Sequence, residues 1–421
     1  MMHTLYTLIW LLGLPFALLR TRLRGRREPG YLEDIRGRLG LGPRPPSRPT
    51  LWLHAVSVGE TRAAAPLLTA LRARYPEHRI LITQMTATGR ATARALYGDF
   101  AEFAWLPWDL PWAQRAFLRR WRPALGIVME TEIWPNLVHE CRRAGVPVVL
   151  ANARMSARSA ARYARLGGFV RAVLRDFSAL VVQTAEDAAR LSALGAPRVA
   201  VAGNLKFDIE PPASQLDLGR AWRAGLGPRR VLLLASTRED EEAPLLDALL
   251  PELPSDVLIA LVPRHPQRFD EVAGGILSRG LTLCRRSTGA APDTNTRVWL
   301  GDSMGEMFAW YALADLALIG GSWQPLGGQN LIEACAVGCP VVIGPHTFNF
   351  ATSTLDAIDA GAAIRATDEA NAAAIARALL DDPERRRRMA TAAREFAGAH
   401  RGATARTLEV LEALLPPGRN D

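Results

Sequence analysis

The chain has 421 residues, 49% hydrophobic and 22% charged, which is enough for two ordinary domains with full cores. Its net charge is +9, and Lys206 is the only lysine, so nearly all of the cations are arginines. An arginine bias of this kind reflects genome composition and is no sign of nucleic-acid binding, but the charge favours a phosphate-rich ligand or an anionic membrane surface.

The N-terminal segment is typical of a membrane anchor. Residues 1–19 carry no formal charge, which is close to the roughly 20 apolar residues that a spanning helix needs. Arginines follow within residues 20–27, and no small-residue cleavage site comes after them. The positive-inside rule therefore favours an uncleaved anchor over residues 1–27, with the body of the protein in the cytoplasm. A helix that lies in the membrane interface is the alternative geometry.

The first half of the body, residues 28–207, alternates apolar runs with amphipathic stretches after a Gly/Pro/Arg-rich connector over 31–50. This alternation predicts a parallel, doubly wound sheet with helices such as 63–74 and 185–193 between the strands. The expected strands are 51–55, 79–83, 103–106, 125–129, 146–151, 179–183 and 199–202.

A second series of the same kind occupies residues 228–421. The segment 208–227 contains Pro211-Pro212 and few apolar runs, which indicates a linker. After it we expect strands at 231–235, 257–262, 281–284, 298–300, 314–319 and 341–343, and a helical tail over 371–414. The sequence thus predicts two Rossmann-like domains that face a cleft, with ligands bound at the carboxyl ends of the strands.

Carboxylates follow two strands of the first half. Glu60 stands at the start of a helix, in His54-Ala-Val-Ser-Val-Gly-Glu, where it could act as a general base. The alternative is that it only complements the helix N-terminus, which would lower its pKa. Glu130 and Glu132 follow another strand, and their alternation predicts that one faces the cleft and the other is structural.

The second half contains a glycine-rich stretch from Gly320 to Pro345, which follows the expected strand 314–319 and reads as loop, helix and strand. The helix, over 331–337 with Gly338 as its stop, would offer N–H groups to a phosphate, and Glu333 could reach a sugar hydroxyl. A tight βα turn with a capping charge is the alternative. Arg264, after another strand, is placed for bidentate phosphate contact, with a surface ion pair as its alternative.

No metal site is expected. The chain has no Asp-x-Asp triplet, the usual metal ligand of enzymes that bind nucleotide diphosphates. The cysteines lie in apolar contexts without CxxC spacing, which predicts reduced core residues of a cytosol-facing protein; they are Cys141, Cys284, Cys335 and Cys339.

Nine short motifs recur in order along the chain, and together they resemble the transferases of Kdo (3-deoxy-D-manno-octulosonic acid) that act in lipopolysaccharide synthesis. The resemblance covers essentially the whole chain. Its motifs are HAVSVGET, TATG, ETEIWPN, NARMSARS, GNLKFD, PRHPQRF, GDSMGE, GGSWQPLGGQNLIEA and GPHTFNF. It implies a GT-B glycosyltransferase, inverting and metal-independent, that needs no cofactor and moves Kdo from CMP-Kdo to the lipid A precursor, lipid IVA.

The same resemblance implies the site residues. Glu60, in the SVGE motif, would be the general base, and one carboxylate of the ExE motif is needed, for which we favour Glu130 over Glu132. The contacts to CMP would come from Pro263, Arg264, Met304, Gly305, Glu306, Asn330, Leu331, Ile332 and Glu333. The implied location is the cytoplasmic leaflet of the inner membrane. The alternatives are a GT-B enzyme that acts on a UDP-sugar and a non-catalytic, membrane-tethered anion-binding protein.

Overall fold

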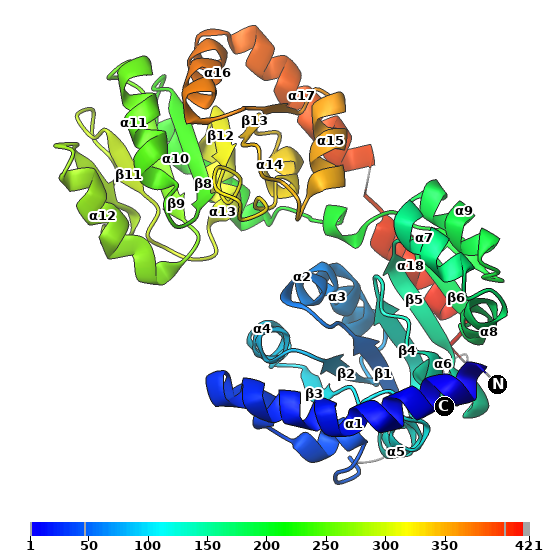
Figure 1. The fold of residues 1–421 in the computed structure, drawn as a ribbon. Helices are drawn as coiled ribbons and strands as arrows, with labels where there is room; N and C mark the ends of the chain where they lie inside the picture. Colours follow the sequence, from blue (N-terminus) through cyan, green and yellow to red (C-terminus); the bar gives the residue numbers. More distant parts are fainter. Residues whose placement is uncertain (1, 46–47, 400, 416–421) are drawn as a thin grey trace. The chain divides into compact units, whose positions relative to one another are not determined.

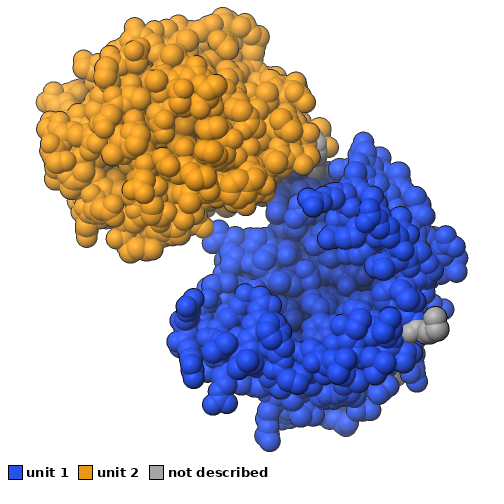
Figure 2. All heavy atoms as spheres, viewed as in Figure 1, with its two compact units in different colours: residues 1–208, 401–421 blue, residues 209–400 orange. Residues whose placement is uncertain are grey.

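The computed structural model describes residues 2–45, 48–399 and 401–415, and the chain forms two compact units (Figures 1 and 2). Unit 1 comprises residues 1–208 and 401–421, and unit 2 comprises residues 209–400. Each unit contains a seven-stranded sheet in which all neighbouring strands are parallel. The prediction of two doubly wound, Rossmann-like domains is confirmed.

In unit 1 the strand order is β3-β2-β1-β4-β5-β6-β7. The strands are β1 (Thr50–His54), β2 (Arg79–Gln84), β3 (Ala101–Trp105), β4 (Pro123–Met129), β5 (Val148–Ala153), β6 (Ala179–Val182) and β7 (Val199–Val201). The helices are α1 (Met2–Arg27), α2 (Val58–Ala63), α3 (Ala65–Arg74), α4 (Ala87–Tyr97), α5 (Pro111–Trp121), α6 (Pro135–Arg143), α7 (Ala157–Ala164), α8 (Gly168–Asp176), α9 (Ala185–Ala193) and α18 (Ala403–Glu412).

The two faces of this sheet bury alternate residues of β1. Leu51 and Leu53 pack in a cluster with side chains of α3, α4 and α18, whereas Trp52 packs in a second cluster with side chains of α5, α6 and α8. Both faces of the sheet are therefore shielded from water. That is why the strands appear in the sequence as continuous apolar runs rather than as alternating patterns.

Unit 2 repeats the design with the strand order β10-β11-β9-β8-β12-β13-β14. Its strands are β8 (Val231–Thr237), β9 (Leu258–Pro263), β10 (Leu283–Arg285), β11 (Val298–Leu300), β12 (Leu316–Ile319), β13 (Val341–Ile343) and β14 (Ala363–Arg365). Its helices are α10 (Ala213–Leu226), α11 (Glu242–Glu252), α12 (Phe269–Leu277), α13 (Met307–Leu313), α14 (Ile332–Val337), α15 (Ala351–Asp359), α16 (Glu369–Asp381) and α17 (Pro383–Ala399).

Most of the segment expected as a linker is a helix of unit 2. Helix α10 occupies it, and the ring of Trp222 lies 5.1 Å from that of Trp299 and 4.8 Å from that of Trp310. A carbon at the Cβ position of Gly219 would lie 2.4 Å from the carbonyl oxygen of Ala309, so a glycine is needed for this close packing. The extended part of the expected linker is confined to the residues around Pro211-Pro212.

The last helix belongs to unit 1, although the sequence placed the whole helical tail in the second domain. Leu411 and Leu415 are buried in the cluster that contains Leu51 and Leu53. The carboxylate of Asp208 accepts hydrogen bonds from the N–H groups of Gly402 and Thr404, which ties the start of α18 to the end of the first domain. The chain therefore returns to its first sheet, and the prediction that 228–421 forms the second domain is wrong for this helix.

Candidate active site

The strand order of unit 1 reverses between β1 and β4, which both lie at the centre of the sheet. At such a switch point the loops at the carboxyl ends diverge and leave room for a ligand. Glu60 lies in the helix that follows β1, and Glu130 and Glu132 lie directly after β4. The sequence therefore placed its candidate carboxylates at the position in the sheet where ligands bind.

Glu60 is fixed by a reciprocal cap at the start of α2. The Ser57 hydroxyl accepts from the N–H of Glu60 at 3.2 Å and donates to its carboxylate at 3.1 Å. The N–H of Val56 donates to the other carboxylate oxygen at 2.6 Å. Burial raises the pKa of Glu60 above its ordinary value, the bond from Val56 opposes this, and the charge of Glu130 adds to it. Burial thus overcomes the capping effect that would make Glu60 a weak base.

A second loop closes on this cap. The Thr86 hydroxyl donates to the carbonyl of Val56 at 2.8 Å and also accepts from the N–H of Gly89 in the first turn of α4. A Cβ at Gly89 would lie 2.9 Å from the same carbonyl oxygen, so the hydroxyl-rich loop reaches the Glu60 cap only with a glycine there.

Glu130 is buried between two cations. Its carboxylate lies 3.3 Å from Nε of Arg154 and 3.6 Å from Nζ of Lys206, and 5% of the residue is exposed. The backbone of Glu130 has φ of 55°, a left-handed conformation that is uncommon outside glycine. A strained, buried residue between two cations indicates that the fold holds Glu130 to organise Arg154 and Lys206.

Glu132 is the third carboxylate at this switch point, and it is half-buried. It accepts from Nε1 of Trp134 at 2.9 Å. Burial, followed by the charges of Glu60 and Glu130, raises its pKa to about 7. The structure thus separates the two glutamates of the ExE motif by environment: Glu130 lies between two cations, whereas Glu132 shares the electrostatic environment of Glu60.

In unit 2 the strand order reverses between β8 and β12, and the glycine-rich loop follows β12. A Cβ at Gly320 would lie 2.4 Å from the carbonyl oxygen of Ser236, and Ser236 itself has φ of 57°. The end of β8 and the start of the loop after β12 therefore touch backbone to backbone. This contact explains why the glycine-rich stretch begins where it does.

Glu241 holds these two loops together, and sequence reasoning missed it. Its fully buried carboxylate accepts from the N–H groups of Arg238 at 2.8 Å, Gly321 at 2.7 Å and Trp323 at 3.0 Å. A longer bond of 3.4 Å comes from the N–H of Gln324. The residue stands within the run Glu239 to Glu242, which resembles a solvated acidic surface and gives no signal of this role.

The candidate donor residues lie around this switch point. Pro263 ends β9, and Arg264, half-buried, donates its N–H to the carbonyl of Thr237 at 2.9 Å. Burial and then the charge of Arg238 lower the pKa of His265, so that the imidazole is neutral at pH 7. The loops after β8 and β9, which carry Arg238 and Arg264, are thus fixed by backbone hydrogen bonds at the carboxyl ends of these strands.

The turn after β11 carries the next candidates. The Glu306 carboxylate accepts from Arg286 at 2.8 Å and from the hydroxyl of Ser303. Met304 is exposed, and Gly305 has φ of 81° in open space. The loop therefore presents backbone and an apolar side chain to its surroundings, while Glu306 is held by its partners.

The segment Asn330 to Glu333 forms the start of α14. The Asn330 side chain accepts from the N–H of Ile332 at 3.0 Å and donates to the carboxylate of Glu333 at 3.2 Å, whereas Leu331 is buried. The helix ends at Gly338, whose φ of 82° is the left-handed stop that the sequence predicted. The roles of these residues in donor binding stay predictions.

Within the described ranges, no group of three His, Cys, Asp or Glu side chains could hold a metal ion. The metal-independent chemistry expected from the sequence is a separate matter and stays a prediction.

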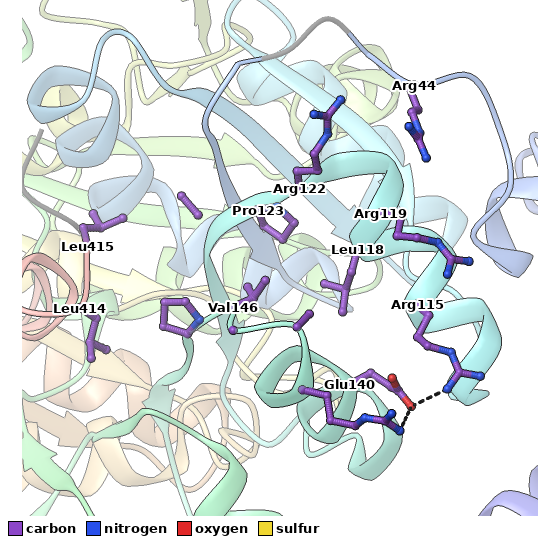
Figure 3. Close-up of a pocket in the computed structure, with 15 residues that line it drawn as sticks. Arg44, Arg115, Leu118, Arg119, Arg122, Pro123, Glu140, Val146, Leu414 and Leu415 are labelled. Carbon is purple, nitrogen blue, oxygen red and sulfur yellow. Dashed lines mark hydrogen bonds and ion pairs between the residues drawn. The ribbon is translucent and has the colours of Figure 1, made fainter. Parts of the chain in front are cut away.

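An arginine-lined depression of 980 Å³ in unit 1 is not part of this site (Figure 3). It lies between α5 and α6, where Arg115 and Arg143 both contact Glu140, at 3.3 and 4.0 Å. Pro123 begins β4 and Pro147 precedes β5, so the depression lies at the amino ends of the strands. The carboxylates described above lie at the opposite, carboxyl ends.

Comparison with known proteins agrees with this architecture. Residues 33–209 match the family described as 3-deoxy-D-manno-octulosonic-acid transferase (kdotransferase), and residues 259–396 match glycosyl transferases group 1. Among solved structures, a glycosyltransferase from Rickettsia africae covers 88% of this chain and 100% of its own with a TM-score of 0.56 at 12% identity. Anabaena HepE in complex with UDP covers 87% of this chain and 99% of its own with a TM-score of 0.55 at 16% identity. These two likenesses concern the fold alone, the two-domain GT-B fold.

Two sequence relatives are much closer. The 3-deoxy-D-manno-octulosonic acid transferase of Bordetella pertussis is 47% identical over 405 residues, which cover 92% of this chain and 94% of the relative. That of Haemophilus influenzae is 36% identical over 422 residues, which cover 97% of this chain and 98% of the relative. With both units matched at these identities, the chain belongs to the family of 3-deoxy-D-manno-octulosonic acid transferases.

Proposed function

We propose that this Kdo transferase moves Kdo from CMP-Kdo to a sugar hydroxyl of the lipid A precursor, with inversion and without a metal ion. The observation that carries the proposal is the position of Glu60, a buried carboxylate with a raised pKa at the switch point of unit 1. A general base works best when its pKa lies near the operating pH, and burial moves that of Glu60 in this direction.

The chemistry assigned to Glu60 is removal of one proton. Its carboxylate takes the proton from the acceptor hydroxyl as the oxygen attacks the anomeric carbon of Kdo. The bond between that carbon and the phosphate oxygen breaks through an oxocarbenium-like state, and CMP leaves with the bonding electron pair. Attack on the face opposite the leaving group inverts the configuration at the anomeric carbon.

Glu130 supports this step as a positioning residue. Its carboxylate holds Arg154 and Lys206 at the end of the sheet that carries Glu60. Those two cations suit an acceptor that carries phosphate groups. We therefore keep Glu130 as the essential carboxylate of the ExE motif. Glu132 would adjust the local charge through its own protonation state.

Unit 2 would bind the donor. CMP-Kdo carries one phosphate and the sugar's own carboxylate, so guanidinium groups and backbone N–H groups can neutralise it. Arg264 lies on the loop after β9, beside the loops that Glu241 fixes. The nucleotide contacts assigned to Pro263, Met304, Gly305, Glu306 and Asn330 to Glu333 belong to the same proposal.

Helix α1 fits an acceptor that resides in a bilayer. It is long and apolar enough to cross a membrane, and it ends in a cluster of arginines. We propose that it attaches the enzyme to the cytoplasmic leaflet of the inner membrane, where basic residues meet anionic lipid.

Mass spectrometry of the product tests the proposed reaction. The chain is incubated with lipid IVA and either CMP-Kdo or a panel of UDP-sugars. We expect a mass increase by whole Kdo units with CMP-Kdo and no transfer from any UDP-sugar. Turnover of a UDP-sugar, without turnover of CMP-Kdo, would replace the proposed donor.

A further inference from the structure

One face of helix α1 is joined to unit 1 by hydrogen bonds in its first turns. The Tyr6 hydroxyl donates to the carboxylate of Asp109 at 2.8 Å, and that of Thr7 donates to the side chain of Asn136 at 3.0 Å. Nε1 of Trp10 donates to the Tyr6 oxygen at 2.8 Å. Asp109 is fully buried, so Tyr6 completes a network inside the domain rather than a contact on its surface.

The same face stays in contact to the end of the helix. Trp10, Leu14 and Ala17 pack against the buried cluster around Trp108 at the start of α5. In the last turn, a Cβ on Gly25 would lie 2.2 Å from the side chain of Leu32, so the helix approaches the following segment as closely as glycine allows. From Tyr6 to Ala17 these positions recur every three or four residues, and Gly25 lies about two turns further on, so they share one face of the helix. Figure 1 shows α1, in dark blue, running along unit 1 past α5 and α6.

The opposite stripe is apolar and exposed. Leu12 is 83% exposed and Phe16 68% exposed, the highest fractions in the helix among its large hydrophobic side chains. The exposed large apolar residues of α1 are Met2, Leu5, Leu8, Ile9, Leu11, Leu12, Phe16, Leu18, Leu19 and Leu23. Five arginines lie at the C-terminal end of the helix, at positions 20, 22, 24, 26 and 27.

We infer that α1 lies flat in the interface of an anionic bilayer. The face that carries Tyr6, Trp10, Leu14 and Ala17 packs on unit 1, and the face that carries Leu12 and Phe16 lies among the lipid chains. The inference rests on the membrane attachment proposed above and sharpens it. An interfacial helix buries one apolar face and pairs its basic residues with lipid phosphates, which matches the two stripes and the arginine cluster.

A spanning orientation is incompatible with the docked stripe. A spanning helix is surrounded by lipid or by other membrane segments over about 20 residues. Here the contacts run from Tyr6 to Gly25, against a domain with a buried carboxylate at Asp109. Withdrawing Tyr6 into hydrocarbon would leave its hydroxyl without Asp109, and a buried polar group without a partner is costly. A flat helix keeps every one of these contacts.

Labelling of cysteines with a membrane-impermeant maleimide tests the orientation. The background is Cys284→Ser in the full chain, because Cys284 is half-exposed, contrary to the core position that the sequence predicted, whereas the other cysteines are buried. Thr4→Cys probes the exposed start of the helix and Arg26→Cys probes its end. Both variants are expressed in cells, from which inner-membrane vesicles with their cytoplasmic face outward are prepared.

A flat helix predicts that both positions react to a similar extent in intact vesicles, because both ends lie on the cytoplasmic side. A spanning helix would protect Thr4→Cys until detergent is added, while Arg26→Cys reacts before; that result would overturn the inference. Labelling does not depend on catalysis, so a chain that fails to transfer Kdo can still show a flat helix, and an active chain can still show a spanning one.

A second experiment tests the lipid-facing stripe. Leu12→Asp with Phe16→Asp should abolish co-sedimentation with vesicles of phosphatidylethanolamine and phosphatidylglycerol. Leu96→Asp is the matched control, since Leu96 is an exposed leucine of unit 1 outside α1, and it should leave co-sedimentation unchanged. Circular dichroism confirms that each variant is folded. Unchanged binding of the double variant, or a wild-type chain that forms dimers and ignores vesicles, would contradict the proposed contact with lipid.

Discussion

Glu132 and Glu60 share one electrostatic environment at the carboxyl ends of β1 and β4. After burial, the charge of Glu60 is the largest cause that raises the pKa of Glu132 to about 7. A site in which one carboxylate keeps its proton allows a neighbouring one to ionise and act as a base. We propose that the two glutamate motifs provide this division of roles.

Glu132→Gln should flatten the dependence of stability on pH. Because its pKa is raised in the folded state, the folded chain holds a proton on Glu132 that the unfolded chain loses above its ordinary pKa. Stability therefore falls as the pH rises from that ordinary value to about 7. The variant lacks this loss, on the order of 2 kcal/mol.

Calorimetric melting of the full chain at a series of pH values across this window tests this. The stability of unit 1 in the variant should exceed that in the wild type by an amount that grows with pH. Glu77→Gln, an exposed glutamate of the same unit, should follow the wild type. Parallel curves for Glu132→Gln and the wild type would mean that Glu132 is ionised throughout.

Glu130→Gln should impair transfer more than it impairs folding. It leaves Arg154 and Lys206 without the carboxylate that lies between them, but both cations reach solvent, so the loss of stability is about 1–2 kcal/mol. Steady-state kinetics should show a rise in KM for lipid IVA with CMP binding unchanged. Wild-type KM and kcat in the variant would remove Glu130 from the site.

Glu241→Gln should weaken donor binding without touching the donor. The amide offers only one good acceptor to the N–H groups of Arg238, Gly321 and Trp323, and its NH₂ group faces donors. We expect unit 2 to lose about 2–3 kcal/mol of stability. Calorimetric titration with CMP should show weaker binding, whereas Glu239→Gln, its exposed neighbour, should bind normally. Equal affinity in both variants would argue against the control of the loop by Glu241.

Gly320→Ala should disrupt the glycine-rich loop. The new Cβ would lie 2.4 Å from the backbone oxygen of Ser236, which cannot move aside as a flexible side chain can, so we expect a loss of about 2–3 kcal/mol. Gly274→Ala, in open space within α12, is the control and should stabilise the helix by roughly 0.5–1 kcal/mol. Chemical denaturation of unit 2 measures both, and equal effects of the two substitutions would rule out a close contact between the loops.

Much of the fold was predictable because buried parallel strands are apolar without interruption and helices stop at characteristic residues. Gly338 is an example, since a left-handed residue after a helical run is a local feature. The strand β14, at the sheet edge, was not predicted, because Ala363 to Arg365 is short and gives little apolar signal. The candidate carboxylates and Arg264 were singled out by their position after strands, whereas most of the nucleotide contacts were implied only by the family resemblance.

Long-range partners could not be read from local patterns. Glu241 stands in an acidic run, and its burial depends on N–H groups that come about 80 residues later. The apolar stripe of α18 predicts that the helix packs against a sheet, but it does not indicate which of the two sheets. Helix α1 is apolar on two stripes, so composition alone suggests a spanning segment and hides the docked face.

The proposed transfer reaction depends most on Glu60, and exchange of this residue for glutamine tests its role directly. Glu60→Gln keeps the shape and can still accept from Val56, but it cannot take a proton. We predict that transfer from CMP-Kdo to lipid IVA falls by about 10²-fold or more, as for a lost general base, while CMP binds with the wild-type affinity. In the wild type, transfer should fall as the pH is lowered through the raised pKa of Glu60. Transfer at the wild-type rate by Glu60→Gln would contradict the account.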